Sequence, residues 1–221
     1  MTLTDLSLFQ TYARTLCVHA CHLIAEGYAR MDKAVFASEQ EPAITGELVR
    51  EIRIYMESAN DTPAWVDCYS IHDDPPLSVS GKLGKFRPRV DIEFECVAKG
   101  PRPRLRFEAK RLNSTTGHTV ARYLGKEGLG CFLSGRYPMT HGEAGMLGYV
   151  QSDDEVTWAK RIETMLRREE GKHAVMDPPF TRKYLCPLLL HYYASQHRRL
   201  YGNAPVIIHH ILLSFVANGK R

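Results

Sequence analysis

The chain has 221 residues, of which 44% are hydrophobic and 24% are charged, a composition typical of a soluble globular protein and not of a disordered chain. Its net charge of +4 is too small to identify a nucleic-acid-binding protein by itself. Six scattered cysteines exclude a disulfide-stapled secreted domain and favour reduced thiols in the cytoplasm.

The first predicted element is an amphipathic helix from residue 4 to about residue 30. Its apolar positions recur at helical spacing and are Leu6, Phe9, Ala13, Leu16, Ala20, Leu23 and Tyr28. Arg14 interrupts the apolar run, so the segment is neither a signal peptide nor a membrane span. We expect a single domain of residues 1–221, in which an N-terminal helical segment, 1–38, packs on a core, 40–221.

The same helix carries two cysteines and two histidines, Cys17, His19, Cys21 and His22. A structural zinc site needs four converging ligands, and no second cluster with Cys-x-x-Cys or His-x-x-x-His spacing follows in the chain. Cysteines in helices usually serve as small buried hydrophobic side chains. We therefore expect these cysteines to pack in the core.

A second helix is predicted over residues 44–56, with Thr45 as its cap. Its apolar face consists of Leu48, Ile52, Tyr55 and Met56. Three acidic residues lie on or beside it: Glu47, Glu51 one turn later on the same side, and Glu41 just outside the helix. One of these carboxylates is a candidate for the site described next.

Two strands with strict alternation follow, at residues 89–96 and 105–112. In the first strand Asp91 alternates with apolar residues. In the second, Glu108 and Lys110 point to one face while Phe107 and Ala109 point to the other. Glu108 and Lys110 therefore share a face.

A Gly-Pro loop between these strands predicts an antiparallel hairpin. We expect the register that pairs Glu93 with Arg106 and Glu95 with Arg104, because both pairs join opposite charges. The same register sets Arg89 against Lys110, and it brings Asp91 opposite Glu108 at about 5 Å, where two carboxylates repel unless a cation lies between them. A divalent metal ion would remove this conflict.

An aspartate on one strand followed by Glu-x-Lys on the next resembles the active-site signature of the PD-(D/E)XK nuclease superfamily, which has the restriction-endonuclease-like fold. Here the matching residues are Asp91, Glu108, Ala109 and Lys110, with Val90 where the signature often has proline. The family also has a glutamate on the helix before the hairpin. The resemblance gives Glu47 as the expected residue, with Glu51 and Glu41 as alternatives.

The order of the later elements agrees with this resemblance. A helical or loop stretch at 123–133 precedes an apolar strand at 144–151. A helix opened by Asp153 and Asp154 runs to Arg168, and strands at 188–193 and 206–215 complete the sheet. We therefore expect an α/β fold with a mixed central sheet flanked by helices, a restriction-endonuclease-like core with an added N-terminal helix.

Basic residues surround the acidic centre between Lys82 and Arg111. They are Lys85, Arg87, Arg89, Lys99, Arg102, Arg104, Arg106 and Lys110. A basic rim around a metal-binding acidic centre suits a polyanionic substrate. Arg87, Arg89 and Arg111 are the expected nucleic-acid contacts. The glycines at 125–130 do not form a P-loop and are expected to let a backbone phosphate approach, with Tyr123 and Lys126 as further contacts.

The resemblance implies a metal-dependent endonuclease that hydrolyses nucleic acid, with DNA favoured. Asp91, Glu108 and the Ala109 carbonyl would hold Mg²⁺ or Mn²⁺, Glu47 would join directly or through water, and Lys110 would orient a water molecule or stabilise the transition state. The whole chain gives the impression of a cytoplasmic bacterial defence nuclease subunit with an anti-phage role. We expect no membrane association, and a protein partner or homo-oligomer fits this setting.

Two alternatives remain from the sequence. The first is a non-catalytic nucleic-acid-binding or assembly subunit of a larger defence complex, in which the acids serve as ion pairs. The second is a metal-dependent hydrolase of nucleotides or other phosphorylated small molecules, for which the basic rim is larger than needed.

Overall fold

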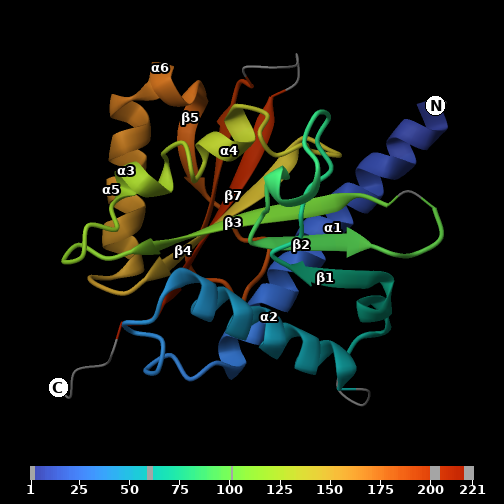
Figure 1. Ribbon diagram of the computed structural model, residues 1–221, viewed down its shortest axis with the longest axis horizontal. Helices are drawn as coiled ribbons and strands as arrows, with labels where there is room; N and C mark the ends of the chain where they lie inside the picture. Colours follow the sequence, from blue (N-terminus) through green and yellow to red (C-terminus); the bar gives the residue numbers. More distant parts are fainter. Residues whose placement is uncertain (1–2, 59–61, 101, 200–204, 217–221) are drawn as a thin grey trace.

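The computed structural model describes residues 3–58, 62–100, 102–199 and 205–216, and these form one seven-stranded mixed sheet with helices on both faces (Figure 1). The elements in chain order are α1 (Leu3–Arg30), α2 (Glu41–Glu57), η1 (Ala64–Cys68), β1 (Tyr69–Asp73), η2 (Gly84–Phe86), β2 (Ile92–Cys96), β3 (Arg104–Leu112), α3 (Val120–Tyr123), α4 (Gly130–Leu133), β4 (Glu143–Val150), α5 (Glu155–Arg168), α6 (Glu170–His173), β5 (Val175–Arg182), β6 (Tyr192–His197) and β7 (Val206–Ser214).

The strands lie in the order β1-β2-β3-β4-β7-β6-β5. The first three form an antiparallel meander, β3, β4 and β7 are parallel, and β7, β6 and β5 are again antiparallel. A parallel step needs a crossover connection, and α3 and α4 lie within the one that joins β3 to β4. The predicted α/β fold with a mixed, helix-flanked sheet is confirmed.

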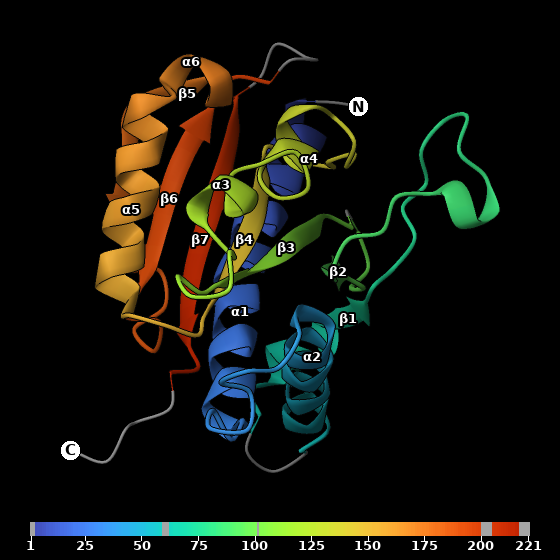
Figure 2. The ribbon, with the colours of Figure 1, turned by 60° about the vertical axis from the view of Figure 1, so that its left-hand side comes forward.

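Two hydrophobic clusters occupy the two faces of the sheet. One packs α1 and α2 against Phe107, Ala109 and Leu147. The other packs α3, α4 and α5 against Leu112 and Met146. Figure 2 shows α5 and α6 on one side of the strands and α1 on the other. Although α1 has 28 residues, no helix in the described part of the chain is both long and apolar enough to cross a membrane.

The hairpin that carries Asp91 and Glu108 has the predicted register. Glu93 lies opposite Arg106 and Glu95 opposite Arg104. Each arginine donates to its predicted partner, at 2.6 Å from Arg106 Nε to Glu93 and at 2.8 Å from Arg104 Nη2 to Glu95. The Glu93–Arg106 pair is buried, and Arg106 also donates to the Pro138 carbonyl, so the ion pair has the further hydrogen bond that burial demands.

Gly145 lets β4 approach β3 closely beside this hairpin. It lies opposite Phe107 in the parallel register. A Cβ atom at Gly145 would lie 2.0 Å from the Phe107 ring, which is far inside van der Waals contact. The absence of a side chain at Gly145 therefore leaves room for the Phe107 ring against β4. This packing positions β3, which carries Glu108 and Lys110.

Two predicted boundaries are wrong. The helix predicted at 44–56 begins at Glu41, because Pro42 is well suited to a first helical turn, and Thr45 is not its cap. Thr45 is buried, and its hydroxyl lies 2.9 Å from the Tyr149 hydroxyl. The strand predicted at 188–193 is β6, Tyr192–His197, since Leu188 and Leu190 are 57% and 68% exposed in the preceding loop.

Candidate metal centres on the two faces of the sheet

The structure brings Asp91, Glu108 and Lys110 together at the hairpin. Asp91 directly precedes β2, and Glu108 and Lys110 lie on one face of β3. The Ala109 N–H donates to Asp91 Oδ2 at 2.6 Å, and Lys110 Nζ donates to Glu108 Oε1 at 2.8 Å. The strand alternation thus places two carboxylates and one ammonium in one cluster, which we call the oxygen cluster.

The third carboxylate of the oxygen cluster comes from Glu41. Lys110 Nζ donates to Glu41 Oε1 at 2.9 Å, and the Arg111 N–H donates to its other oxygen at 3.3 Å. The choice of Glu47 is corrected by this geometry. Both oxygens of Glu47 accept from Arg50, and Glu51 also accepts from Arg50, so neither contacts the cluster. The reason is that α2 begins at Glu41 and points its first turn, not its second, at β3.

The oxygen cluster contains donor atoms of the type that hard divalent cations prefer, but within the described residues its carboxylates do not form a group as compact as a metal site. The Lys110 ammonium lies among three oxygens, because it also donates to the Ala109 carbonyl at 2.6 Å. Carboxylate and carbonyl oxygens are the ligands that Mg²⁺ and Mn²⁺ prefer. With Asp91 beside them, these atoms supply the ligand types of a magnesium site.

Tyr137 holds the remaining oxygen of Glu108. Its hydroxyl lies 2.8 Å from Glu108 Oε2 and 2.6 Å from the Arg89 carbonyl, and it can donate to one of the two at a time. Sequence patterns gave no signal for this residue, because it lies in the loop between α4 and β4. Its hydroxyl orients Glu108 within the cluster.

Burial and mutual repulsion perturb the acids. Burial raises the pKa of Asp91 to about 6, although Lys110 and the Ala109 N–H oppose the shift. Burial and the charge of Asp91 raise the pKa of Glu108 to about 7. Burial alone would lower the pKa of Lys110, but Glu108, Glu41 and Asp91 outweigh it and raise the pKa above its usual value. The nearby cations do not fully compensate the buried negative charges of Asp91 and Glu108, so both acids bind protons more readily than usual. The Lys110 ammonium stays charged.

Basic side chains line a pocket of about 480 Å³ beside Lys110, which also contains Glu41. The basic residues in it are Lys110, Arg111, Arg122 and Lys126. The Arg111 side chain lies 2.6 Å from His118 and donates to the Glu39 carbonyl at 3.3 Å. The predicted contacts Arg111 and Lys126 thus lie next to the oxygen cluster.

A second basic pocket, also of about 480 Å³, lies in the segment that joins β1 to β2. Its basic residues are Lys82, Lys85, Arg87 and Arg136. Figure 2 shows this segment standing away from the edge of the sheet. Arg89, which is exposed, is paired with Asp74 on the same segment. The segment therefore gathers Arg87 and two lysines at one pocket.

Tyr123 does not contact solvent, so its predicted role in nucleic-acid binding is wrong. The side chain is fully buried in the cluster under α5, and its hydroxyl lies 3.0 Å from His210 Nδ1. The glycines at 125, 128 and 130 allow close contacts within their own backbone segment. A Cβ atom at Gly128 would lie 2.1 Å from the Tyr123 carbonyl, so this glycine permits a tight turn rather than the approach of a phosphate.

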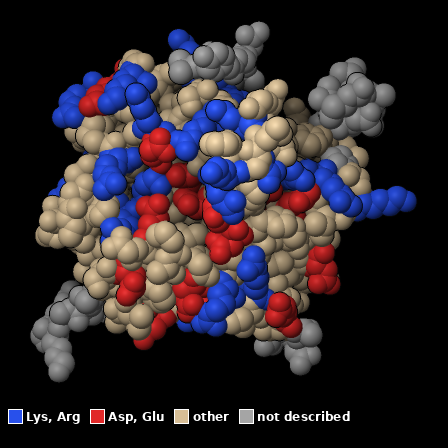
Figure 3. All heavy atoms as spheres, viewed as in Figure 1, with Lys and Arg blue, Asp and Glu red and all other residues tan. Residues whose placement is uncertain are grey.

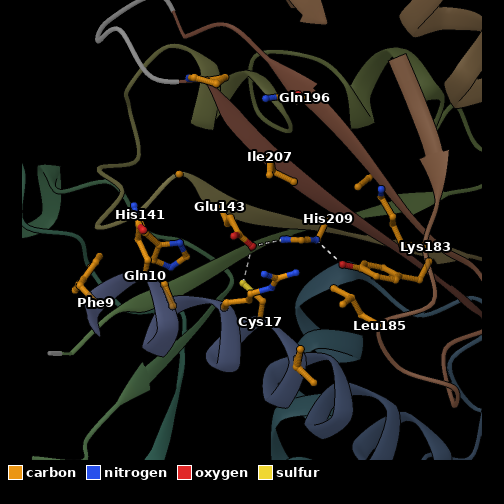
Figure 4. A pocket seen from close by; sticks show the side chains of 17 residues that line it. Phe9, Gln10, Cys17, His141, Glu143, Lys183, Leu185, Gln196, Ile207 and His209 are labelled. Carbon is orange, nitrogen blue, oxygen red and sulfur yellow. Dashed lines mark hydrogen bonds and ion pairs between the residues drawn. The ribbon is translucent and has the colours of Figure 1, made fainter. Parts of the chain in front are cut away.

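A second cluster, which we call the sulfur cluster, lies on the opposite face, where α1 crosses β4 and β7 (Figure 4). Its members are Cys17, Glu143 and His209, whose ligand atoms all lie within 4.8 Å of one another. Cys17 Sγ donates to Glu143 Oε2 at 2.8 Å, and His209 Nε2 lies 2.7 Å from the same oxygen. This buried cluster has the ligand atoms and the spacing to hold a metal ion.

The electrostatics of the sulfur cluster depend on the Glu143 carboxylate. Burial alone would raise the pKa of Glu143, but hydrogen bonds from His209 and Cys17 outweigh it and lower the pKa to about 2. Burial, together with the nearby Glu143 charge, raises the pKa of the Cys17 thiol. Without a cation the sulfur therefore stays protonated and donates to Glu143.

The sequence predicted the burial of Cys17 but not its partners. No spacing rule links a helix near the N-terminus to strands that follow more than 100 residues later. His209 and His210 are neighbours on β7 and point in opposite directions: His209 faces Glu143 and α1, and His210 faces Tyr123. Glu143 and His209 lie close together because β4 pairs in parallel with β7.

Comparison of the chain with models of known protein families, with curated proteins and with solved structures gave no match. The chemistry of the two clusters is therefore the basis on which a function can be assigned.

Proposed function

We propose that the chain is a metal-dependent nuclease that hydrolyses phosphodiester bonds of nucleic acid, DNA in the first instance, at the oxygen cluster. The observation that carries this proposal is the ammonium of Lys110 held between Glu108 and Glu41, with Asp91 held beside them by the Ala109 N–H. Three acids with one cation leave excess negative charge, which a divalent metal ion neutralises.

Asp91, Glu108, Glu41 and the Ala109 carbonyl are the groups that would hold Mg²⁺ or Mn²⁺. All are hard oxygen donors, and they come from α2, from β3 and from the residue directly before β2, so the fold rather than one flexible loop orients them. A bound divalent cation supplies Lewis acidity for phosphodiester hydrolysis. The carboxylates fix its position beside Lys110.

Lys110 and Tyr137 have different roles in this scheme. Lys110 remains protonated, so its Nζ stabilises negative charge that develops on the phosphate, or donates to the attacking water. Tyr137 is a positioning residue, because its hydroxyl acts on Glu108 Oε2 and not on the substrate. No covalent intermediate with the protein is required.

The surroundings of the oxygen cluster favour a polymer over a small phosphorylated molecule. Its cations are spread over two pockets, one with Arg111 and Lys126, the other with Lys85 and Arg87. Figure 3 shows acidic side chains in a band across this face, with Lys and Arg side chains on both sides. Such a surface attracts a phosphate backbone at several points along its length.

The order of elements supports the resemblance to the PD-(D/E)XK nucleases. A helix that carries Glu41 precedes the strands with Asp91 and Glu108, and a strand parallel to β3 follows. A cytoplasmic role in anti-phage defence, with a protein partner or a second copy of the chain, is the setting that this resemblance suggests.

The second candidate function is a non-catalytic nucleic-acid-binding or assembly subunit. One observation favours it: Lys110 already has two carboxylate partners, so the acids also satisfy a purely structural ion-pair network. In that case the basic pockets would bind nucleic acid, and no cleavage would follow.

Plasmid DNA and a long RNA, each incubated with the protein in Mg²⁺, Mn²⁺ or EDTA, test the proposal. We expect cleavage of plasmid with either metal and none in EDTA. Asp91→Asn should remove cleavage, whereas Asp67→Asn, at an exposed acid in η1, should not. Binding without cleavage under every condition would select the second candidate. Cleavage of RNA alone would change the substrate but keep the mechanism.

A further inference from the structure

We propose that the sulfur cluster is a second metal site, specific for zinc and chemically separate from the oxygen cluster, in which Cys17, Glu143 and His209 bind one ion between α1 and the strands β4 and β7. This proposal does not depend on the nuclease activity. It assigns a ligand to a part of the molecule that the proposed phosphodiester chemistry does not use.

The geometry of the sulfur cluster suits a single ion. One thiol, one carboxylate oxygen and one imidazole nitrogen converge within 4.8 Å, and each comes from a different element. Figure 4 shows the three side chains pointing toward one another at one wall of the pocket. Glu143 Oε2 lies between the other two groups, because it takes part in both hydrogen bonds.

The donor types favour zinc over magnesium. Zn²⁺ binds thiolate, imidazole and carboxylate ligands together, whereas Mg²⁺ prefers oxygen ligands. When the ion binds, the S–H bond of Cys17 breaks, the sulfur bonds to the metal as a thiolate, and the proton passes to water. His209 Nε2, which donates to Glu143 in the metal-free protein, gives up its proton, and the imidazole takes the tautomer with the proton on Nδ1. One thiolate and one carboxylate then balance the charge of Zn²⁺, so the buried site becomes neutral.

His209 already has the orientation of a zinc ligand. Its Nδ1 is hydrogen-bonded to the Tyr192 hydroxyl, and its Nε2 faces Glu143 and the cluster. Metal-bound histidines commonly use their second nitrogen in this way, which fixes the ring and the tautomer. The Tyr192 hydroxyl therefore fixes the orientation of the ring, and its oxygen can accept from Nδ1–H once Nε2 binds the ion.

An independent observation comes from His141, which lines the same pocket. Both of its ring nitrogens are buried, and within the described residues neither has a hydrogen-bonding side chain as partner, although the Arg104 backbone lies beside the ring. An imidazole buried without partners is costly, and such a group calls for an explanation. Figure 4 places His141 beside Glu143, so it is the candidate for the fourth ligand position.

The pocket gives an ion and its water a way in. It has a volume of about 700 Å³, and Cys17, Glu143 and His209 all line it. Three protein ligands and an open fourth position are typical of zinc sites that exchange a ligand, whereas four protein ligands are typical of structural sites. In either case the ion joins α1 to the centre of the sheet and stabilises that junction.

Zinc and cobalt titrations of the metal-free, full-length protein test the site. We expect one zinc ion per chain, a rise in Tm, and a thiolate charge-transfer absorption with Co²⁺. Cys17→Ser should lose the absorption and weaken zinc binding by about 100-fold or more. The matched control is Cys96→Ser, in β2, where the cysteine is equally buried but outside the cluster; it should keep both signals.

Three outcomes support or overturn the proposal, and they do not depend on the Cys17 variant folding alone. A thiolate band in the wild-type protein with Co²⁺, lost in His209→Gln, supports the site without any change at cysteine. A wild-type protein that binds Co²⁺ with no thiolate band, or that binds no zinc, overturns it. Zinc binding that survives Cys17→Ser but is lost in Glu108→Gln also overturns it, because the ion would then lie in the oxygen cluster.

Discussion

The two clusters use the same sheet in opposite ways. The oxygen cluster contains three carboxylates and one ammonium, which contacts two of them, so its formal charge is −2 when all its acids are ionised. The sulfur cluster contains one carboxylate with a thiol and an imidazole. Under the proposals above, the first cluster would attract a hard divalent ion through charge, and the second would select a softer ion through its ligand types.

Their positions differ as well. The oxygen cluster is built by a hairpin and the first turn of α2, next to basic pockets that a polymer can reach. The sulfur cluster is built by parallel strands and α1, inside a pocket with few cations. Under the two proposals, one face carries a reactive centre and the other a site that would hold an ion and stabilise the fold.

Among the variants proposed here, removal of the Lys110 side chain should cause the largest loss of cleavage. Lys110→Ala is expected to reduce cleavage by about 1,000-fold, since it removes the charge that stabilises the transition state. Metal-free stability should fall, because three acids lose their cation, and Mg²⁺ should restore it. Cleavage rates and urea unfolding with and without Mg²⁺ measure both effects.

Lys99→Ala is the matched control, because Lys99 is exposed in the loop between β2 and β3. It should leave the cleavage rate and the response to Mg²⁺ unchanged. Full activity of the Lys110 variant would remove the lysine from the mechanism, and zinc binding should be the same in both variants.

Acid should destabilise the fold through His197, which lies outside both clusters. Burial lowers its pKa to about 4, and the unfolded value is about 6.5, so its contribution to stability is complete above pH 6.5 and is lost as the pH falls toward 4. The loss amounts to roughly 2 to 3 kcal/mol. Urea unfolding between pH 7.5 and pH 4 measures it, and His197→Asn should flatten the profile. An unchanged slope in that variant would assign the effect to other groups.

Gly145→Ala should disturb the strand that lies between the clusters. The added methyl group meets the Phe107 ring, so we expect a loss of about 1 to 3 kcal/mol in the free energy of unfolding. Gly171→Ala, in α6, is the control, because no atom lies within 4 Å of a Cβ there. Equal stability of the two variants would mean that β4 can move away from Phe107 at no cost.

Glu41→Gln should have a smaller effect on cleavage. It removes one carboxylate charge but keeps an oxygen near Lys110, so we expect about a 10-fold higher Mg²⁺ requirement. Glu47→Gln is the matched control in the same helix and should be silent, since Glu47 contacts Arg50. The reverse ranking would show that α2 turns a different face to the substrate complex.

The sequence was sufficient for the oxygen cluster because its main members are local. Strand alternation alone puts Glu108 and Lys110 on one face, and the charge pairs of the hairpin fix the register that brings Asp91 near. From the sequence, Glu41 is only an alternative to Glu47 as the third carboxylate, because Thr45 resembles a helix cap. In the structure the helix starts one turn earlier, with Pro42 in its first turn. Tyr137 lies in a loop, where no periodicity applies.

The sulfur cluster was beyond sequence reasoning for a physical reason. Cys17 meets Glu143 and His209 because α1 packs across two parallel strands, and that contact depends on the order of strands in the sheet. Local patterns predict which residues share a face of one element, but not which elements become neighbours. Buried ligands from three distant elements therefore become visible only in the folded chain.

The most direct test of the central claim is the rate of plasmid nicking in Mg²⁺ by the wild-type protein, Glu108→Gln and Cys17→Ser, with zinc removed by a selective chelator. We predict Mg²⁺-dependent nicking by the wild-type protein, a loss of at least about 100-fold in Glu108→Gln, and near wild-type rates in Cys17→Ser at a temperature where it stays folded. Nicking by Glu108→Gln at the wild-type rate, or no nicking by the wild-type protein, would contradict the assignment of catalysis to the oxygen cluster.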